Sequence, residues 1–226
     1  MNKQWKRFSE ASQKCYDDMA AGKIHLTVWD QAYQVLKEVI AAEREANPAY
    51  ARELYEIDEG NDLKYQVEDW VLDYQEMLDT LQEHKKLQKV CEELIAMFQW
   101  EEYSPTDLRF HVMIALQGQE KYQEAHAYGE RWFQEEEDNP YAAAALIYAR
   151  MGVEDDAGAE QLVERFIPEG TACTEENDVL FGAAEKLYEK TGNQEAEARI
   201  LKALELYDQE LEQYFETMDQ EDLSFS

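Results

Sequence analysis

Residues 187–206 read LYEKTGNQEAEARILKALEL, and the predicted fold depends on this stretch. Two segments rich in Glu, Lys, Ala and Leu, which are good helix formers, flank a turn at Gly192 and Asn193. A glycine at such a place commonly takes the left-handed conformation that ends a helix and reverses the chain. In the second segment Ala196, Ile200 and Ala203 recur at helical spacing and share one face. The stretch therefore predicts a helical hairpin.

The same arrangement of small and apolar residues occurs three more times along the chain. The corresponding positions are Leu87, Ala125, Ala159 and Ala196, which follow one another at intervals of 38, 34 and 37 residues. A sustained interval of this size indicates a repeated two-helix unit. Scarce Gly and Pro, with 9 and 4 residues, agree with an all-α chain.

Local signals mark where the helices of each unit end and begin. Gly118 and Gly152, like Gly192, stand between two apolar-periodic segments, where we expect left-handed helix ends. Capping residues followed by proline or acids indicate three helix starts, at Ser104-Pro105, Asn139-Pro140 and Thr174. The unit is thus predicted to be helix, Gly turn, helix.

These features resemble the tetratricopeptide repeat (TPR) family, whose unit is about 34 residues long. The small, large and small residues Ala196, Ile200 and Ala203 match its second helix, and residues 118–125, GQEKYQEA, are similar to its inter-helix turn. The repeats are degenerate, because none has the full W-x2-L-G-x2-Y signature. The resemblance implies an all-α, right-handed α-solenoid of antiparallel helix pairs, with about five helical hairpins, that works as a protein-binding scaffold.

Four regions are expected along the chain. Residues 1–46 form an N-terminal helical hairpin, residues 47–61 an acidic insertion with room for a short helix, and residues 62–211 the TPR-like array. Residues 212–226 form the end of a C-terminal capping helix and an acidic tail. A terminal capping helix is expected to have a polar outer face.

The charge balance excludes several partners. With 21 Lys and Arg against 51 Asp and Glu, the net charge is −30. Such a surface repels nucleic acid and anionic lipid headgroups. No apolar run approaches the ~20 residues of a membrane-spanning helix, and Met1 to Glu10 lacks the apolar core of a signal peptide. We expect a cytoplasmic protein.

The residue types that carry chemistry form no recognisable constellation. The three cysteines, Cys15, Cys91 and Cys173, are far apart and are expected to be buried small hydrophobes. The four histidines are scattered without metal-ligand spacing, and the carboxylates are too abundant to single out a catalytic pair. We expect no catalytic residue, no metal site, no cofactor and no enzymatic activity.

Aromatic residues, 12% of the chain, are the candidates for binding. The resemblance implies that the first helix of each pair lines a concave face. The helical period places acids and aromatics there: Leu72, Glu76, Asp79, Phe110, Ile114, Gln117, Tyr141, Tyr148, Asp178, Phe181, Glu185 and Tyr188. Such a groove suits a basic or amphipathic peptide segment. The alternative is that these aromatics only pack between neighbouring hairpins.

The main functional hypothesis is an adaptor or scaffold that holds a partner protein or peptide in this acidic, aromatic groove. A secretion-type chaperone for an aggregation-prone client and a peptide-sensing regulator remain alternatives. For the regulator, no basic DNA-recognition helix precedes Trp29.

Overall fold

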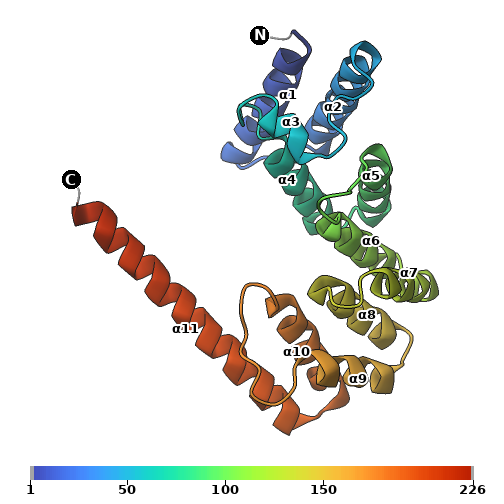
Figure 1. Ribbon diagram of the computed structural model, residues 1–226, viewed down its shortest axis with the longest axis vertical. Coiled ribbons are helices and arrows are strands. Elements are labelled where there is room, and N and C mark those ends of the chain that lie inside the picture. Colours follow the sequence, from blue (N-terminus) through green and yellow to red (C-terminus); the bar gives the residue numbers. More distant parts are fainter. Residues whose placement is uncertain (1–2, 225–226) are drawn as a thin grey trace. The chain divides into compact units, whose positions relative to one another are not determined.

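The computed structural model describes the backbone of residues 3–224 and the side chains of residues 3–215. Over that range the chain forms eleven helices and no strand, which confirms the all-α class (Figure 1). In chain order the helices are α1 (Lys3–Ala20), α2 (Leu26–Ala46), α3 (Tyr55–Glu59), α4 (Val67–Thr80), α5 (His84–Met97), α6 (Thr106–Gly118), α7 (Tyr122–Glu135), α8 (Pro140–Gly152), α9 (Asp156–Phe166), α10 (Asp178–Thr191) and α11 (Gln194–Ser224). None of these helices is long and apolar enough to span a bilayer. The end of the predicted acidic tail, residues 225–226, lies outside the described residues.

The chain divides into two compact units. The first ends at His111 and the second begins at Val112, so the boundary falls within α6. It also falls within residues 62–211, the range predicted for the repeat array. The first unit contains α1 to α5, and the second contains α7 to α11.

One turn motif joins five consecutive helix pairs, α1/α2, α4/α5, α6/α7, α8/α9 and α10/α11. Each turn contains a left-handed residue: Gly22 (φ 66°), Gln82 (56°), Glu120 (60°), Glu154 (64°) and Gly192 (71°). The next residue donates its N–H to the carbonyl five positions back, at 2.9, 2.8, 3.0, 2.9 and 3.1 Å respectively. This 6→1 hydrogen bond is the Schellman helix ending, which satisfies carbonyls at the helix end and reverses the chain.

Two of the three predicted left-handed glycines were wrong. Gly192 is left-handed, but α6 and α8 continue through Gly118 and Gly152, and the left-handed residues are Glu120 and Glu154. Gly152 is needed for space instead, because a Cβ there would lie 2.9 Å from the ring of Tyr122 at the start of α7.

The predicted helix starts fared differently. The side chain of Asn139 caps α8 by accepting N–H bonds from Tyr141 and Ala142, as expected. The start at Thr174 was wrong, since α10 begins at Asp178. The Asn177 side chain accepts the N–H of Thr174 at 2.8 Å and closes a turn ahead of the helix. Asn competes effectively for backbone groups in this way.

Stacked aromatic rings form the core of the first unit. Trp29, Trp70 and Tyr74 have ring centroids 5.5 to 6.0 Å apart and are nearly fully buried. The Tyr74 hydroxyl donates to Asp30 at 2.6 Å, and Lys86 donates to the same carboxylate at 2.7 Å. Burial of the rings and this shared carboxylate hold α2, α4 and α5 together.

The segment predicted as an acidic insertion, residues 47–61, is tied into the first unit and holds the short helix α3. The Arg44 guanidinium donates to the carbonyls of Tyr50, Ala51 and Met97 at 3.3, 2.6 and 2.8 Å. The Asp58 carboxylate accepts the first two N–H groups of α4, both at 2.9 Å. The insertion thereby caps the helix that follows it.

Helix α8 is the centre of the second unit. It buries every residue from Ala142 to Ile147, and α7, α9 and α10 all pack against it. Small side chains allow this close approach. On α7, a Cβ at Gly129 would stand 3.5 Å from the Cα of Leu146.

Candidate functional site

A pocket of the second unit lies between the segment that connects α9 to α10 and the first half of α11. It has a volume of about 290 Å³ and a mainly apolar lining. Its wall includes Ile167, Pro168 and Cys173 of the connecting segment, Phe181 of α10, and Ile200 and Tyr207 of α11. We call it the apolar pocket.

The wall of the apolar pocket is firmly seated in the core. Ile167, Cys173, Phe181 and Ile200 are each at most 5% exposed. Burial raises the pKa of the Cys173 thiol from 9.0 to about 11, which extends the pH range over which the thiol is neutral. The charged residues of the lining, Arg199, Lys202 and Glu210, are all exposed. The pocket can therefore take an apolar side chain without displacing a buried charge.

A second pocket of about 600 Å³ adjoins the first and is lined by acids. Its carboxylates are Glu160, Glu164, Glu169 and Glu195, and its other lining residues include Tyr188 and Arg199. We call it the acidic pocket. Burial raises the pKa of the Tyr188 hydroxyl, and the charge of Glu160 raises it further. With four carboxylates and one guanidinium, this pocket favours a cationic group.

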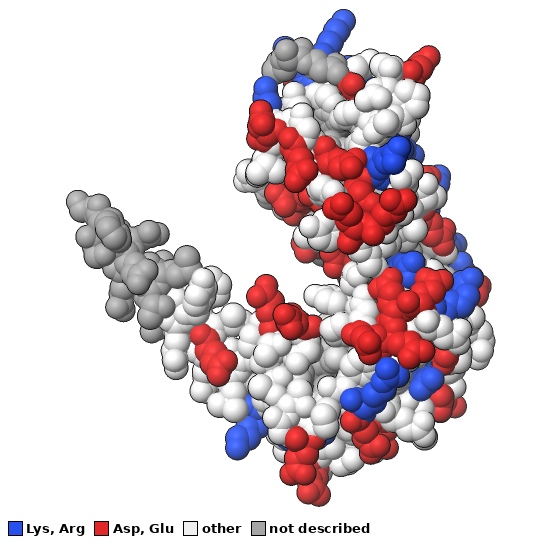
Figure 2. Space-filling view, viewed as in Figure 1, with Lys and Arg blue, Asp and Glu red and all other residues white. Residues whose placement is uncertain are grey.

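The two pockets share three lining residues, Ile167, Pro168 and Arg199. An apolar cavity and a negatively charged one therefore lie side by side on the same unit. A ligand that carries an apolar side chain next to Lys or Arg can occupy both. Acidic side chains are widespread on the face of the molecule that Figure 2 shows, and basic ones are fewer.

The predicted groove residues are divided between the two units. Four belong to the first unit, Leu72, Glu76, Asp79 and Phe110, and the other eight belong to the second. Leu72 and Glu76 are exposed, whereas most of the others are half-buried. Two are almost fully buried, namely Phe181 at 1% and Tyr188 at 3% exposure.

Several of the predicted residues line the pockets described for the two units. Phe181 forms part of the apolar pocket and Tyr188 part of the acidic pocket. Leu72 lines a separate pocket of about 270 Å³ in the first unit. Phe181 and Tyr188 lie mainly in the core because α10 packs against α8 and α9. Most of the surface of these two rings is therefore buried between helices, which agrees with the alternative stated from the sequence, that the aromatics pack between neighbouring hairpins.

Sequence reasoning missed the parts of the site that lie outside the first helices of the pairs. These are residues 167–173 and the α11 residues Arg199, Leu206 and Tyr207. The connecting segment has no helical period that would have placed it. The available signal was the presence of apolar residues such as Leu206 and Tyr207 in a terminal helix that was expected to be polar outside. In the structure Leu206 is 52% exposed.

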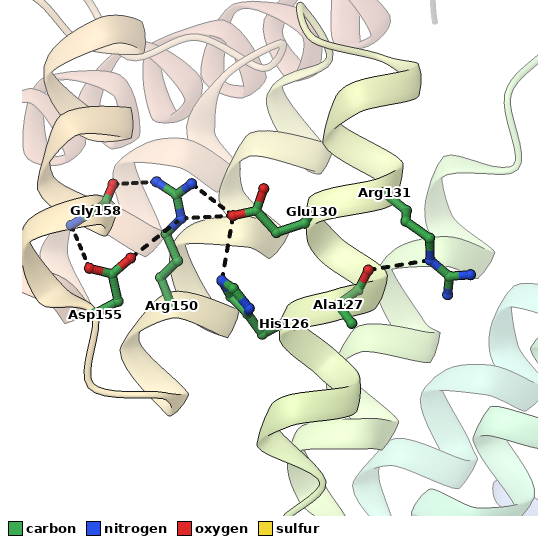
Figure 3. Close-up of polar contacts among 7 residues, drawn as sticks. All are labelled: His126, Ala127, Glu130, Arg131, Arg150, Asp155 and Gly158. Atoms are coloured by element: carbon green, nitrogen blue, oxygen red, sulfur yellow. Dashed lines mark hydrogen bonds and ion pairs between the residues drawn. The ribbon is translucent and has the colours of Figure 1, made fainter.

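A polar network joins α7, α8 and α9 near the start of α9 (Figure 3). Arg150 donates from Nε and Nη2 to Oε1 of Glu130 at 3.3 and 2.8 Å, and from Nη1 to the carbonyl of Gly158 at 2.7 Å. His126 Nε2 lies 3.4 Å from the same Glu130 oxygen. Because these partners satisfy one another, the network stabilises the helix packing. Among the described residues, no group of three or more His, Cys, Asp or Glu could hold a metal ion.

Comparisons with protein-family models, curated proteins and solved structures gave no match. The TPR-like assignment therefore stays a prediction from the residues.

Proposed function

We propose that this protein is an adaptor that binds a basic, amphipathic segment of a partner protein through its second unit. The proposal is carried by one observation, the adjacency of the apolar and acidic pockets across Ile167, Pro168 and Arg199. An apolar side chain of the partner enters the first pocket, and a neighbouring Lys or Arg enters the second. No catalytic role is proposed.

The two pockets contribute different properties to binding. Removing a large aliphatic or aromatic side chain from water contributes roughly 1.5–3 kcal/mol. An exposed ion pair with a glutamate contributes only about 0–1 kcal/mol. The apolar anchor therefore supplies most of the affinity, while the charge supplies encounter rate and selection against acidic partners.

The charge of the second unit supports a basic partner. From Val112 onward the sequence has 28 Asp and Glu against 8 Lys and Arg, which gives −20 of the total −30. A field of this sign accelerates association with cations and weakens as salt rises.

We also propose that the helix pairs form a TPR-like, right-handed α-solenoid. The recurrence of one Schellman turn at residues 82, 120, 154 and 192 supports a repeated unit. A cytoplasmic location is part of the proposal. It is supported by three cysteines that are all free and buried.

Fluorescence anisotropy with labelled peptides tests the adaptor role. Three peptides of equal length are compared at low and high ionic strength: basic and amphipathic, basic without apolar residues, and acidic and amphipathic. We expect the first to bind most tightly, with affinity that falls as salt rises. Equal binding of the first two peptides would show that the apolar pocket takes no part.

A pair of matched variants locates the binding. Ala203 lines the apolar pocket, so Ala203→Phe fills it and is expected to weaken binding of the amphipathic peptide about tenfold, or ~1.4 kcal/mol. Ala198 is exposed on the same helix, and Ala198→Phe serves as the control. Equal effects of the two substitutions would count against the pocket as the site.

A further inference from the structure

The C-terminal helix carries an apolar stripe that continues past its contact with the rest of the second unit. Helix α11 packs on α10 near its start and then runs on as a single helix to Ser224 (Figure 1). Ile200, at 1% exposure, belongs to the packed part. Leu204, Tyr207, Leu211 and Tyr214 follow at spacings of 4, 3, 4 and 3 residues. This alternation of 3 and 4 keeps all of them on one face of the helix.

Exposure of the stripe increases along the helix. Leu204 and Tyr207 are half-buried, Leu211 is 36% exposed and Tyr214 is 59% exposed. Phe215 beside them is 61% exposed. A buried helix seam that becomes an exposed row of Leu, Tyr and Phe is typical of an interaction surface.

Acids flank the stripe, and no base follows it. The sequence has no Lys or Arg after Lys202. Glu205, Asp208 and Glu212 lie three and four residues apart on the helix, so like charges face each other. These repulsions lower the stability of this part of the helix. A partner with Lys or Arg would relieve the repulsion, whereas a second copy of this acidic helix would increase it.

We propose that α11 beyond Ala203 is a docking helix for a basic amphipathic helix of the partner protein. The two helices pair along Leu204, Tyr207, Leu211 and Tyr214, with apolar side chains of the partner between them and its Lys and Arg residues opposite the flanking acids. The inference rests on the proposed function, because Tyr207 also lines the apolar pocket and so connects the two surfaces.

The experiment uses the full chain and two synthetic peptides of about 21 residues, the length of three heptads. The patterned peptide has Leu at alternating spacings of 3 and 4 and mostly Lys elsewhere, and the scrambled peptide has the same composition in another order. Because both carry the same charge, the ratio of their affinities reports the apolar pairing. We expect the patterned peptide to bind at least tenfold more tightly.

Substitutions of exposed residues, which leave the core intact, test whether the stripe causes the preference for the patterned peptide. Leu211→Ser combined with Tyr214→Ser is expected to reduce the affinity ratio to less than threefold. Leu201 is 43% exposed and lies off the stripe, so Leu201→Ser is the matched control and is expected to keep the full ratio. Circular dichroism and urea unfolding of each variant confirm that the fold is retained.

The possible outcomes separate this inference from the proposed function. Binding that is lost in Ala203→Phe but unchanged in the double variant would leave the pocket function standing and overturn the docking helix. Equal affinity for the two peptides would also overturn it. Sedimentation showing a dimer of the full chain that the double variant abolishes would assign the stripe to a second copy, against the proposal. Failure of every basic peptide to bind would remove the proposed function itself.

Discussion

The backbone amide of Gly158 donates to Oδ1 of Asp155 at 3.1 Å, and the rest of that carboxylate occupies the space that a Cβ at Gly158 would need. Asp155 is the N-cap of α9, and its Oδ2 lies 3.9 Å from Nε of Arg150. The carbonyl of Gly158 accepts from the same arginine. Because Gly158 has no Cβ, the capping carboxylate of Asp155 fits between α8 and α9.

The first prediction concerns the coupling of these two residues. Asp155→Ala should lower the free energy of unfolding by about 1 kcal/mol through loss of the cap. Gly158→Ala should be nearly neutral in the wild-type chain, since displacement of the cap offsets a better helix former. In the Asp155→Ala background it should stabilise by about 0.5–1 kcal/mol. Urea unfolding of the four proteins measures the cycle, and additive effects would contradict the arrangement.

The second prediction concerns the left-handed residues of the turns. Glu154 has a φ of 64°, which costs a residue with a Cβ roughly 1–2 kcal/mol. Glycine removes this strain, but it also raises the conformational entropy of the unfolded chain, which offsets part of the gain. Glu154→Gly should therefore raise the free energy of unfolding by about 0.5–1 kcal/mol. Gly192→Ala, at a φ of 71°, should lower it by about 1 kcal/mol. Changes of the same sign would be inconsistent with the shared turn.

The third prediction concerns alkaline pH. The Cys173 thiol stays neutral in the folded chain up to about pH 11, whereas the unfolded thiol ionises near 9.0. Between these values unfolding releases a proton, so the folded state loses stability as pH rises. Cys173→Ala removes this contribution, and its free energy of unfolding should fall less steeply from pH 8.5 to 11 than that of the wild type. Parallel curves would show that the thiol does not contribute.

The fourth prediction concerns the attachment of residues 47–61. Arg44→Met removes the guanidinium that donates hydrogen bonds to three backbone carbonyls. Because these carbonyls lose their donor, the free energy of unfolding should fall by about 2 kcal/mol or more. Hydrogen exchange should increase first in residues 47–61. Arg44→Lys keeps the charge but cannot reach all three carbonyls. Its free energy of unfolding should therefore lie between those of the wild type and Arg44→Met. Unchanged exchange in this segment would show that other contacts hold it.

The helix pairs could be predicted because their signals are local and repeated. A small residue, a large one and a turn recur in the sequence, and the structure places a Schellman turn at each corresponding point. The identity of the left-handed residue could not be predicted at Gly118 and Gly152. At position 152 a glycine is required because the ring of Tyr122, on another helix, leaves no room for a Cβ. This contact is non-local in sequence.

The candidate site could be predicted only in part, for a similar reason. Phe181 and Tyr188 were expected at a binding surface and do line the two pockets, yet their burial depends on how α10 packs. The segment at Ile167 and Pro168 has no periodicity, so its place opposite α11 in the lining of the apolar pocket follows from tertiary packing alone. On α11, the many acids obscured the row of Leu and Tyr between them.

The absence of Lys and Arg after Lys202 also makes α11 a built-in reporter. Trypsin cuts only after these two residue types, and Lys202 is exposed at the start of the helix extension. Cleavage there separates residues 203–226, which contain no further Lys or Arg, from the rest of the second unit, and mass spectrometry identifies the cleavage site without a label. The rate of this cleavage can be compared with and without a candidate partner. A slower rate in the presence of the partner reports that the helix is occupied.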